Sequence, residues 1–193
     1  MKHATTRELY SYWSRLRADR AAPERGDIEP AAIRGVLADT FILEIDEERS
    51  CPLRVVGARV SALFARELKG EAFSSLWRQE DRGALLALIA AVLDDAAPTI
   101  AGGIGRPRGS PGVELEMVLL PLRHYGRTHA RILGAISLGS TPSWLGLLPV
   151  EPLVMTSLRI LGAGGERAPS YGQAWTLDEP VRRGHLLVHS GGR

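Results

Sequence analysis

The chain has one cysteine, two lysines and no asparagine. These shortages argue against particular classes of protein. Cys51 is the single cysteine among 193 residues, which excludes an internal disulfide framework and fits a reducing, cytoplasmic location. Of 24 basic residues only Lys2 and Lys69 are lysines, and asparagine is absent. Arginine excess without asparagine indicates coding bias more than a nucleic-acid surface, because a binding surface gathers its charge in one patch.

Long apolar runs are also missing. The longest, residues 84–93, is far shorter than the roughly 20 residues that a membrane-spanning helix requires. The first residues are charged and lack the apolar segment of a signal peptide. With 45% hydrophobic and 24% charged residues, the composition is that of a soluble globular protein, and we expect no membrane partner.

The strongest pattern lies in residues 114–138. Leu115, Met117 and Leu119 alternate with other residues on the first half, and the same period of two recurs around Ile132 on the second. This period predicts two strands, and the polar residues between them predict a turn. We therefore predict a long antiparallel hairpin. Its other face is partly apolar as well, so we expect another element to cover it.

An amphipathic helix is predicted over residues 6–20. The sequence Thr-Thr-Arg-Glu at residues 5–8 predicts a capping box at its start. Apolar residues follow at helical spacing, and they are Leu9, Tyr12, Trp13 and Leu16. Two interpretations of this stripe stay open: it packs on its own domain, or it forms a contact with a partner protein or a second copy of the chain.

The remaining patterns predict an α+β fold. Strands are expected at residues 40–46, 53–56 and 98–104, and helices at residues 58–68 and 82–94, the latter with Asp81 as its N-cap. Residues 152–161 fit a strand or a helix equally. The order of these elements predicts a five-stranded antiparallel sheet with helices on one face, preceded by the N-terminal amphipathic helix.

This order resembles that of a PAS domain, and particular residues strengthen the resemblance. Over about residues 10–161 the chain is similar to a bacterial PAS-like family that carries a long N-terminal helix. The similar positions are Tyr12, Trp13, Leu16, Arg17, Arg20, Pro23, Arg25, Asp27, Ile28, Pro30, Arg54, Val55, Val56, Gly57, Leu63, Phe64, Glu67, Leu68, Gly70, Trp77, Leu119, Leu120, Pro121, Leu122, Leu133 and Gly134.

The resemblance implies a division of the chain. Residues 1–38 would form an N-terminal helical extension and residues 39–141 the PAS-like core. Residues 142–161 would form a C-terminal extension that packs on the core. Residues 162–193 are rich in Gly, Pro, Ser and Arg, and we expect a mostly disordered tail there.

The resemblance also implies a function. We expect a non-catalytic sensory or regulatory module in signal transduction, which binds a small ligand or a protein partner and signals through helix packing. A ligand pocket would be lined by Val55, Phe64, Trp77, Leu86, Ile89, Met117, Leu119 and Ile132. The alternative is that these residues fill an ordinary core. A homodimer or partner interface would use Leu9, Tyr12, Trp13 and Leu16.

No cofactor or metal is expected. Haem-binding PAS domains use a histidine on a core helix, but no histidine lies in residues 54–95. Photosensory flavin domains use an Asn-Cys motif, and the chain has no asparagine. Two alternative functions stay open: an enzyme using the PAS cavity, and a nucleic-acid-binding regulator. The arginines that would serve nucleic-acid binding are Arg15, Arg17, Arg20, Arg182 and Arg183.

Overall fold

The computed structural model describes residues 1–45, 51–125, 127–161, 181–183 and 186–189. Its helices are α1 (Ala4–Arg17), η1 (Arg25–Asp27), η2 (Pro30–Ile33), η3 (Leu37–Asp39), α2 (Ala58–Phe64), η4 (Phe73–Leu76), η5 (Gln79–Asp81) and α3 (Arg82–Asp94), where η marks a 3₁₀ helix. Its strands are β1 (Thr40–Glu44), β2 (Leu53–Val56), β3 (Thr99–Gly105), β4 (Val113–His124), β5 (Arg127–Leu138), β6 (Val154–Ile160), β7 (Val181–Arg183) and β8 (Leu186–His189).

These strands form one sheet in the order β2-β1-β5-β4-β3-β6-β8-β7. The predicted antiparallel sheet of five strands is confirmed as β1 to β5. The segment left open between strand and helix is strand β6, which lies antiparallel beside β3. Strands β7 and β8 belong to the predicted tail, where β8 pairs in parallel with β6. The rest of that tail lies outside the described residues.

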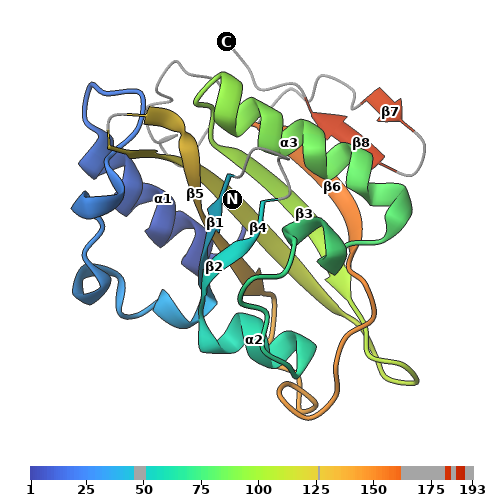
Figure 1. Cartoon of the computed structure of the whole chain (residues 1–193). Helices are drawn as coiled ribbons and strands as arrows, with labels where there is room; N and C mark the ends of the chain where they lie inside the picture. The colour runs from blue at the N-terminus through green and yellow to red at the C-terminus, as the bar shows by residue number, and fades with distance from the viewer. Residues whose placement is uncertain (46–50, 126, 162–180, 184–185, 190–193) are drawn as a thin grey trace, which may run out of the picture.

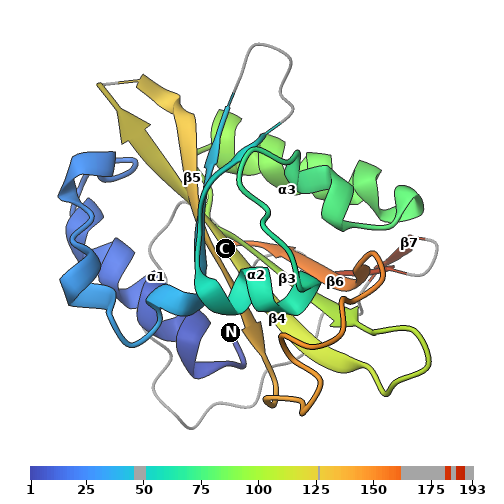
Figure 2. The same ribbon diagram turned by 60° about the horizontal axis from the view of Figure 1, so that its bottom comes forward.

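Helices cover both faces of the sheet (Figures 1 and 2). Helices α2 and α3 lie on one face, and Figure 2 shows α1 on the opposite side of the strands. The element expected to cover the outward face of the hairpin is therefore α1. Helices α1 and α3 are therefore separated by the sheet.

Two hydrophobic clusters result from this layering. The inner core, between the sheet and helices α2 and α3, includes Phe41, Phe64, Phe73, Trp77, Ile89, Met117, Leu119, Ile132 and Met155. The outer core, between the sheet and the N-terminal segment, consists of Leu9, Tyr12, Trp13, Ala22, Ile28, Ile33, Val36, Ile42, Ile100, Val118, Leu120, Leu122, Leu133 and Ala135. Successive residues of β4 enter opposite clusters, as the alternation in the sequence predicted.

Gly134 on β5 makes room for the largest side chain of β1. Gly134 and Phe41 are register partners, and a Cβ atom added at residue 134 would lie 2.2 Å from Cζ of Phe41. The Phe41 ring stacks on Phe73 with 5.0 Å between centroids, and Phe73 meets Trp77 edge-on at 6.4 Å. The small residue on the hairpin thus permits an aromatic chain through the inner core.

A buried carboxylate attaches β6 to the helical layer. The register of β3 and β6 shifts between Gly102 and Gly103, and the N–H of Met155 instead donates to Oδ2 of Asp81 at 2.9 Å. Asp81 occupies the N-cap position of α3, as predicted, but its side chain makes no capping hydrogen bond there. The expected capping role is therefore wrong, because this carboxylate accepts a hydrogen bond from a strand distant in sequence.

Helix α2 is shorter than predicted. The pattern predicted a helix to residue 68, whereas α2 ends at Phe64 because Ala65 adopts the left-handed conformation, with φ of 48°. The chain turns there and brings Leu68 into the inner core from a loop. Helix α3, in contrast, spans the residues predicted for it.

Replacing Gly134 by alanine should destabilise the fold, because the new methyl group overlaps the Phe41 ring. Overpacking of this kind costs about 1–3 kcal/mol, and urea unfolding measures the loss. Gly83→Ala is the control, since nothing lies within 4 Å of a Cβ at this position of α3. It should be neutral or stabilising by roughly 0.5–1 kcal/mol. Equal stability of both variants would contradict the packing argument.

Candidate functional site

Helix α1 is held on the outer face of β4 and β5 by apolar and polar contacts together. Leu9 and Trp13 are fully buried in the outer core. The indole N–H of Trp13 donates to the carbonyl of Pro121 on β4 at 2.8 Å. Tyr12 accepts a hydrogen bond from the backbone N–H of Glu29, also at 2.8 Å. These hydrogen bonds fix the position of α1 along the sheet, because each of them forms only when the helix is in one place. Burial alone would not do so.

A buried carboxylate binds the start of α1. Glu116 on β4 points to the outer face and accepts hydrogen bonds from the backbone N–H of Lys2 at 2.7 Å and of His3 at 3.0 Å. The Thr6 hydroxyl group also donates to its Oε1 atom. Nδ1 of His3 lies 3.0 Å from the carbonyl oxygen of Ser137, the register partner of Glu116 on β5. We call Glu116, Thr6, Ser137 and residues 2–3 the latch.

The latch requires an ionised carboxylate. Burial by itself raises the pKa of Glu116, but the hydrogen bonds from Thr6, Lys2 and His3 and the nearby terminal ammonium group outweigh it, so that the pKa of Glu116 is lowered. A neutral carboxyl group would present a hydrogen to a site where three donors converge. The charge of Glu116 also suits its place at the N-terminal end of a helix.

This arrangement corrects the predicted start of α1. The helix begins at Ala4, with His3 as an N-cap residue that makes no side-chain capping hydrogen bond. The Thr-Thr-Arg-Glu capping box is therefore wrong, because Thr5, its expected N-cap residue, lies inside the helix. Glu114 and Glu116 lie two residues apart on β4 and so share one strand face. Only Glu114 is exposed, because the start of α1 covers Glu116.

The residues predicted to line a pocket fall into two groups. Those buried together in the inner core are Phe64, Trp77, Ile89, Met117, Leu119 and Ile132. Val55 and Leu86 are 47% and 49% exposed, so their assignment to the inner core is wrong. Val55 is the register partner of Ile42 and faces the outer side of the sheet. Leu85 and Ile89 form the face of α3 that packs on the sheet. Leu86 lies outside that face and is therefore exposed.

The inner core contains a buried hydrogen-bond donor that has no partner among the described residues. Trp77 is fully buried, and its indole nitrogen Nε1 is an N–H donor without an acceptor. An unmet donor in an apolar core costs free energy. Trp77 therefore marks a position in the inner core where a hydrogen-bond acceptor would be bound favourably.

A family comparison identifies the architecture. A family model described as a PAS domain, PAS_5, matches residues 1–137, which include α1, both core helices and strands β1 to β4. The chain belongs to the PAS_5 family of PAS domains. The resemblance found in the sequence is thereby confirmed, and α1 with its latch lies within the matched part of this PAS domain.

Solved structures of similar proteins are PAS and LOV domains. The PAS domain of a protein from Colwellia psychrerythraea has a TM-score of 0.44 at 10% identity, covering 57% of this chain and 97% of that one. A LOV protein of Rhodobacter sphaeroides has a TM-score of 0.42 at 12% identity, covering 55% of this chain and 62% of that one. The comparison with curated proteins gave no match.

The stripe predicted to form a dimer contact packs inside this PAS domain. Leu9, Tyr12 and Trp13 are buried in the outer core, and the half-buried Leu16 packs against it. The docked helix turns polar residues such as Arg7 and Arg15 outward. Use of the stripe in a dimer stays a prediction, and it requires α1 to leave the sheet.

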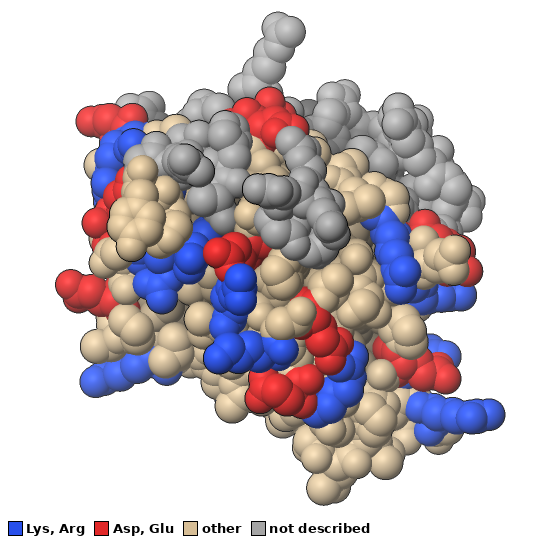
Figure 3. All heavy atoms as spheres, in the orientation of Figure 1, with Lys and Arg blue, Asp and Glu red and all other residues tan. Residues whose placement is uncertain are grey.

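The arginines considered for nucleic-acid binding are partly engaged within the chain. Arg17 lies over the Trp13 ring, and Arg20 forms an ion pair with Asp27 at 2.9 Å. On the face shown in Figure 3, basic and acidic side chains are interspersed. Arg182 and Arg183 lie on β7.

The described part of the chain contains no group of three or more His, Cys, Asp or Glu side chains arranged to hold a metal ion. None of the helices in that part combines the length and apolar character needed to cross a membrane. Cys51 is buried.

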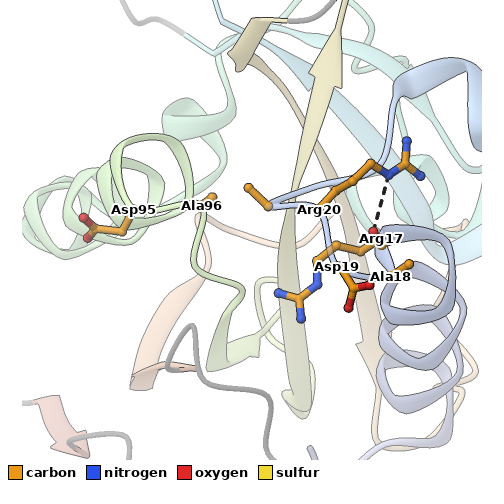
Figure 4. A pocket seen from close by; sticks show the side chains of 7 residues that line it. Arg17, Ala18, Asp19, Arg20, Asp95 and Ala96 are labelled. Atoms are coloured by element: carbon orange, nitrogen blue, oxygen red, sulfur yellow. Dashed lines mark hydrogen bonds between the residues drawn. The ribbon is translucent and has the colours of Figure 1, made fainter.

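A cavity of about 340 Å³ lies outside the predicted pocket. It is lined by residues 17–21, at and after the end of α1, and by Asp95 and Ala96, which follow α3 (Figure 4). Sequence reasoning missed this cavity because its two halves are separated by more than seventy residues and share no motif.

Glu116→Gln should destabilise the protein by about 1.5–3 kcal/mol near neutral pH, because hydrogen bonds to a charged group are lost. Glu114→Gln, an exposed site on the same strand face, is the control and should change little. The lowered pKa of Glu116 means that its contribution is complete above the usual glutamate pKa, roughly 4.3. It is lost as the pH falls through the pKa of the folded state.

Urea unfolding across a pH series measures this difference. The gap in stability between wild type and Glu116→Gln should close on acidification, while Glu114→Gln follows wild type throughout. A gap that stays constant down to acidic pH would show that the charge of Glu116 does not support the latch.

Proposed function

We propose that this PAS domain is a non-catalytic sensory and regulatory module that signals by changing how α1 docks on the sheet. PAS domains generally serve as sensory modules, and the chain belongs to a PAS family. The observation that carries the proposal is that β4 and β5 belong to both cores at once. We place the module in the cytoplasm, in keeping with its single, buried cysteine.

The two cores are coupled through a short physical path. Trp13 of α1 is hydrogen-bonded to Pro121, and Pro121 is the register partner of Ile132 in the inner core. Met117 and Val118 are neighbours in the chain and enter opposite clusters. Packed interiors respond to a change in volume by shifting neighbouring groups. A displacement of β4 or β5 by a group entering the inner core would therefore move the surface on which α1 rests.

The input would be a small apolar molecule that carries a hydrogen-bond acceptor. The site for this molecule would be lined by the buried residues Phe64, Trp77, Ile89, Met117, Leu119 and Ile132. The unpartnered indole N–H of Trp77 supports this choice, because an acceptor placed there removes the cost of an unmet donor. Entry would require repacking of the inner core, so that binding and a shift of the sheet would occur together.

The output would be the apolar stripe of α1. Burial of each large apolar side chain contributes about 1.5–3 kcal/mol, so the docked state predominates in the absence of a signal. Once released, Leu9, Tyr12, Trp13 and Leu16 would be available to a partner protein or to a second copy of the chain. The signal need only supply the free energy that separates the docked and released states.

Glu116→Gln should increase hydrogen exchange of the amides in residues 4–17 by roughly 10–100-fold, since 1.4 kcal/mol corresponds to a factor of ten and the latch contributes about 1.5–3 kcal/mol. Light scattering of the same variant at rising concentration should show self-association through the released stripe. Glu114→Gln should show wild-type exchange and mass.

The pattern of exchange separates release from general unfolding. An increase confined to α1 supports the proposal, whereas an equal increase throughout β3, β4 and β5 shows that Glu116 serves only global stability. Faster exchange in α1 without any rise in mass would leave a partner protein, rather than a second copy, as the receiver of the signal.

Native mass spectrometry of freshly purified protein should show a small molecule bound to a fraction of the chains. Trp77→Phe should reduce this fraction, because phenylalanine offers no hydrogen-bond donor to the ligand. Trp144→Phe is a matched control from the edge of the same core. A spectrum with the mass of the chain alone, from cells and from lysate-supplemented samples, would count against an inner-core ligand.

A further inference from the structure

The cavity between the ends of α1 and α3 combines residues from the two helical layers (Figure 4). Residues 17–21 border it from the outer layer, and Asp95 and Ala96 border it from the inner layer. Its volume of about 340 Å³ lies in the range of small-molecule sites, roughly 300–1,000 Å³. It is distinct from the inner core, whose wall residues do not line it.

Arg17 supplies a cation to this cavity. Its guanidinium carbon lies 5.3 Å from the centroid of the Trp13 ring, which supports the group on one side. Its Nε atom is buried and has no hydrogen-bond partner. Figure 4 shows the Arg17 side chain directed toward the space between the helices, while that of Arg20 is directed away. A carboxylate bound in the cavity would pair with the guanidinium group of Arg17 through charge-assisted hydrogen bonds.

The same cavity also has features that favour a positive charge. It lies at the C-terminal ends of α1 and α3, where the helix dipoles place partial negative charge. The side chain of Asp19, which is exposed, adds a carboxylate to the lining. A ligand with several negative charges would be repelled by these groups, and one with a single carboxylate and an ammonium group would match both signs.

The backbone on both sides of the cavity is held in an uncommon conformation. Ala18 has φ of 49° and ψ of −123°, and Ala96 has φ of 50°. Positive φ is unfavourable for a residue with a Cβ atom, and such residues cluster at ligand-binding sites where the surrounding structure maintains them. Neither end of the cavity uses glycine, so the loops are kept in shape by their contacts.

We propose that this cavity binds a small zwitterion of the α-amino-acid type, with its carboxylate on Arg17 and its ammonium group toward Asp19 and the helix ends. Binding needs α1 in place, because five of the lining residues belong to the end of that helix and the turn after it. The ligand therefore stabilises the docked state by mass action. The stabilisation of docked α1 rests on the proposed function, whereas the binding site itself does not.

The site is tested by NMR titration of the full chain with glycine, L-leucine and L-glutamine. At least one should shift the backbone amides of residues 17–21 and of Asp95 and Ala96. The deaminated and decarboxylated analogues of leucine, 4-methylpentanoate and 3-methylbutylamine, should each bind at least about tenfold more weakly, a difference of about 1.4 kcal/mol. Analogue affinities equal to that of leucine would overturn the zwitterion assignment.

Matched variants assign the charges. Arg17→Gln and Asp19→Asn should each weaken binding about tenfold or more, whereas Arg15→Gln, on the exposed side of the same helix, should bind as wild type does. Asp19 is exposed, so its variant tests the site even if Arg17→Gln perturbs folding. Absence of amide shifts at about 10 mM of all three amino acids, where a Kd of about 1 mM would give near saturation, overturns the site.

Hydrogen exchange separates the site from its role in signalling. Saturating amino acid should slow exchange in residues 4–17 of Glu116→Gln. Amide shifts without slower exchange would support the site but contradict its link to α1 docking. Slower exchange that persists in the Arg17→Gln variant would show that the amino acid binds elsewhere.

Discussion

Burial of β4 and β5 on both faces is the constraint on which this PAS domain depends. One face of each strand closes the inner core under α2 and α3, and the other carries α1. A sheet with apolar residues on both sides must be covered on both sides, because exposed apolar surface is unfavourable. The N-terminal segment is therefore part of the domain's structure and not an appendage to it, in agreement with a family match that starts at residue 1.

Polar contacts determine where the covering helix lies. Apolar burial is non-directional and tolerates sliding, so it cannot fix the position of α1 alone. The bond from Trp13 to Pro121 and the latch at Glu116 each fix one point along the helix. Two fixed points define the position of α1 along the sheet. Because both are contacts to the same strand, β4, the helix can detach from the sheet as one rigid element.

Local patterns in the sequence predicted the elements, and long-range pairing explains what they missed. The hairpin, helix α3 and the PAS architecture follow from periodicity and from a resemblance carried by residues such as Gly134, which lies against Phe41. The roles of Glu116 and Asp81 were missed because each carboxylate bonds to a segment more than seventy residues away. Val55 was assigned to the wrong face because a four-residue strand carries too little pattern to settle its orientation.

Both edges of the sheet are short strands, and this bears on aggregation. Strand β2 is four residues long, and its Arg54 is ion-paired to Glu44. A short, charged edge is a poor template for a foreign strand. At the other end of the sheet β8 pairs with β6, and the edge strand is β7, which is only three residues long. The sheet thus ends in a short strand on both sides, and a short edge offers little backbone to an unrelated chain.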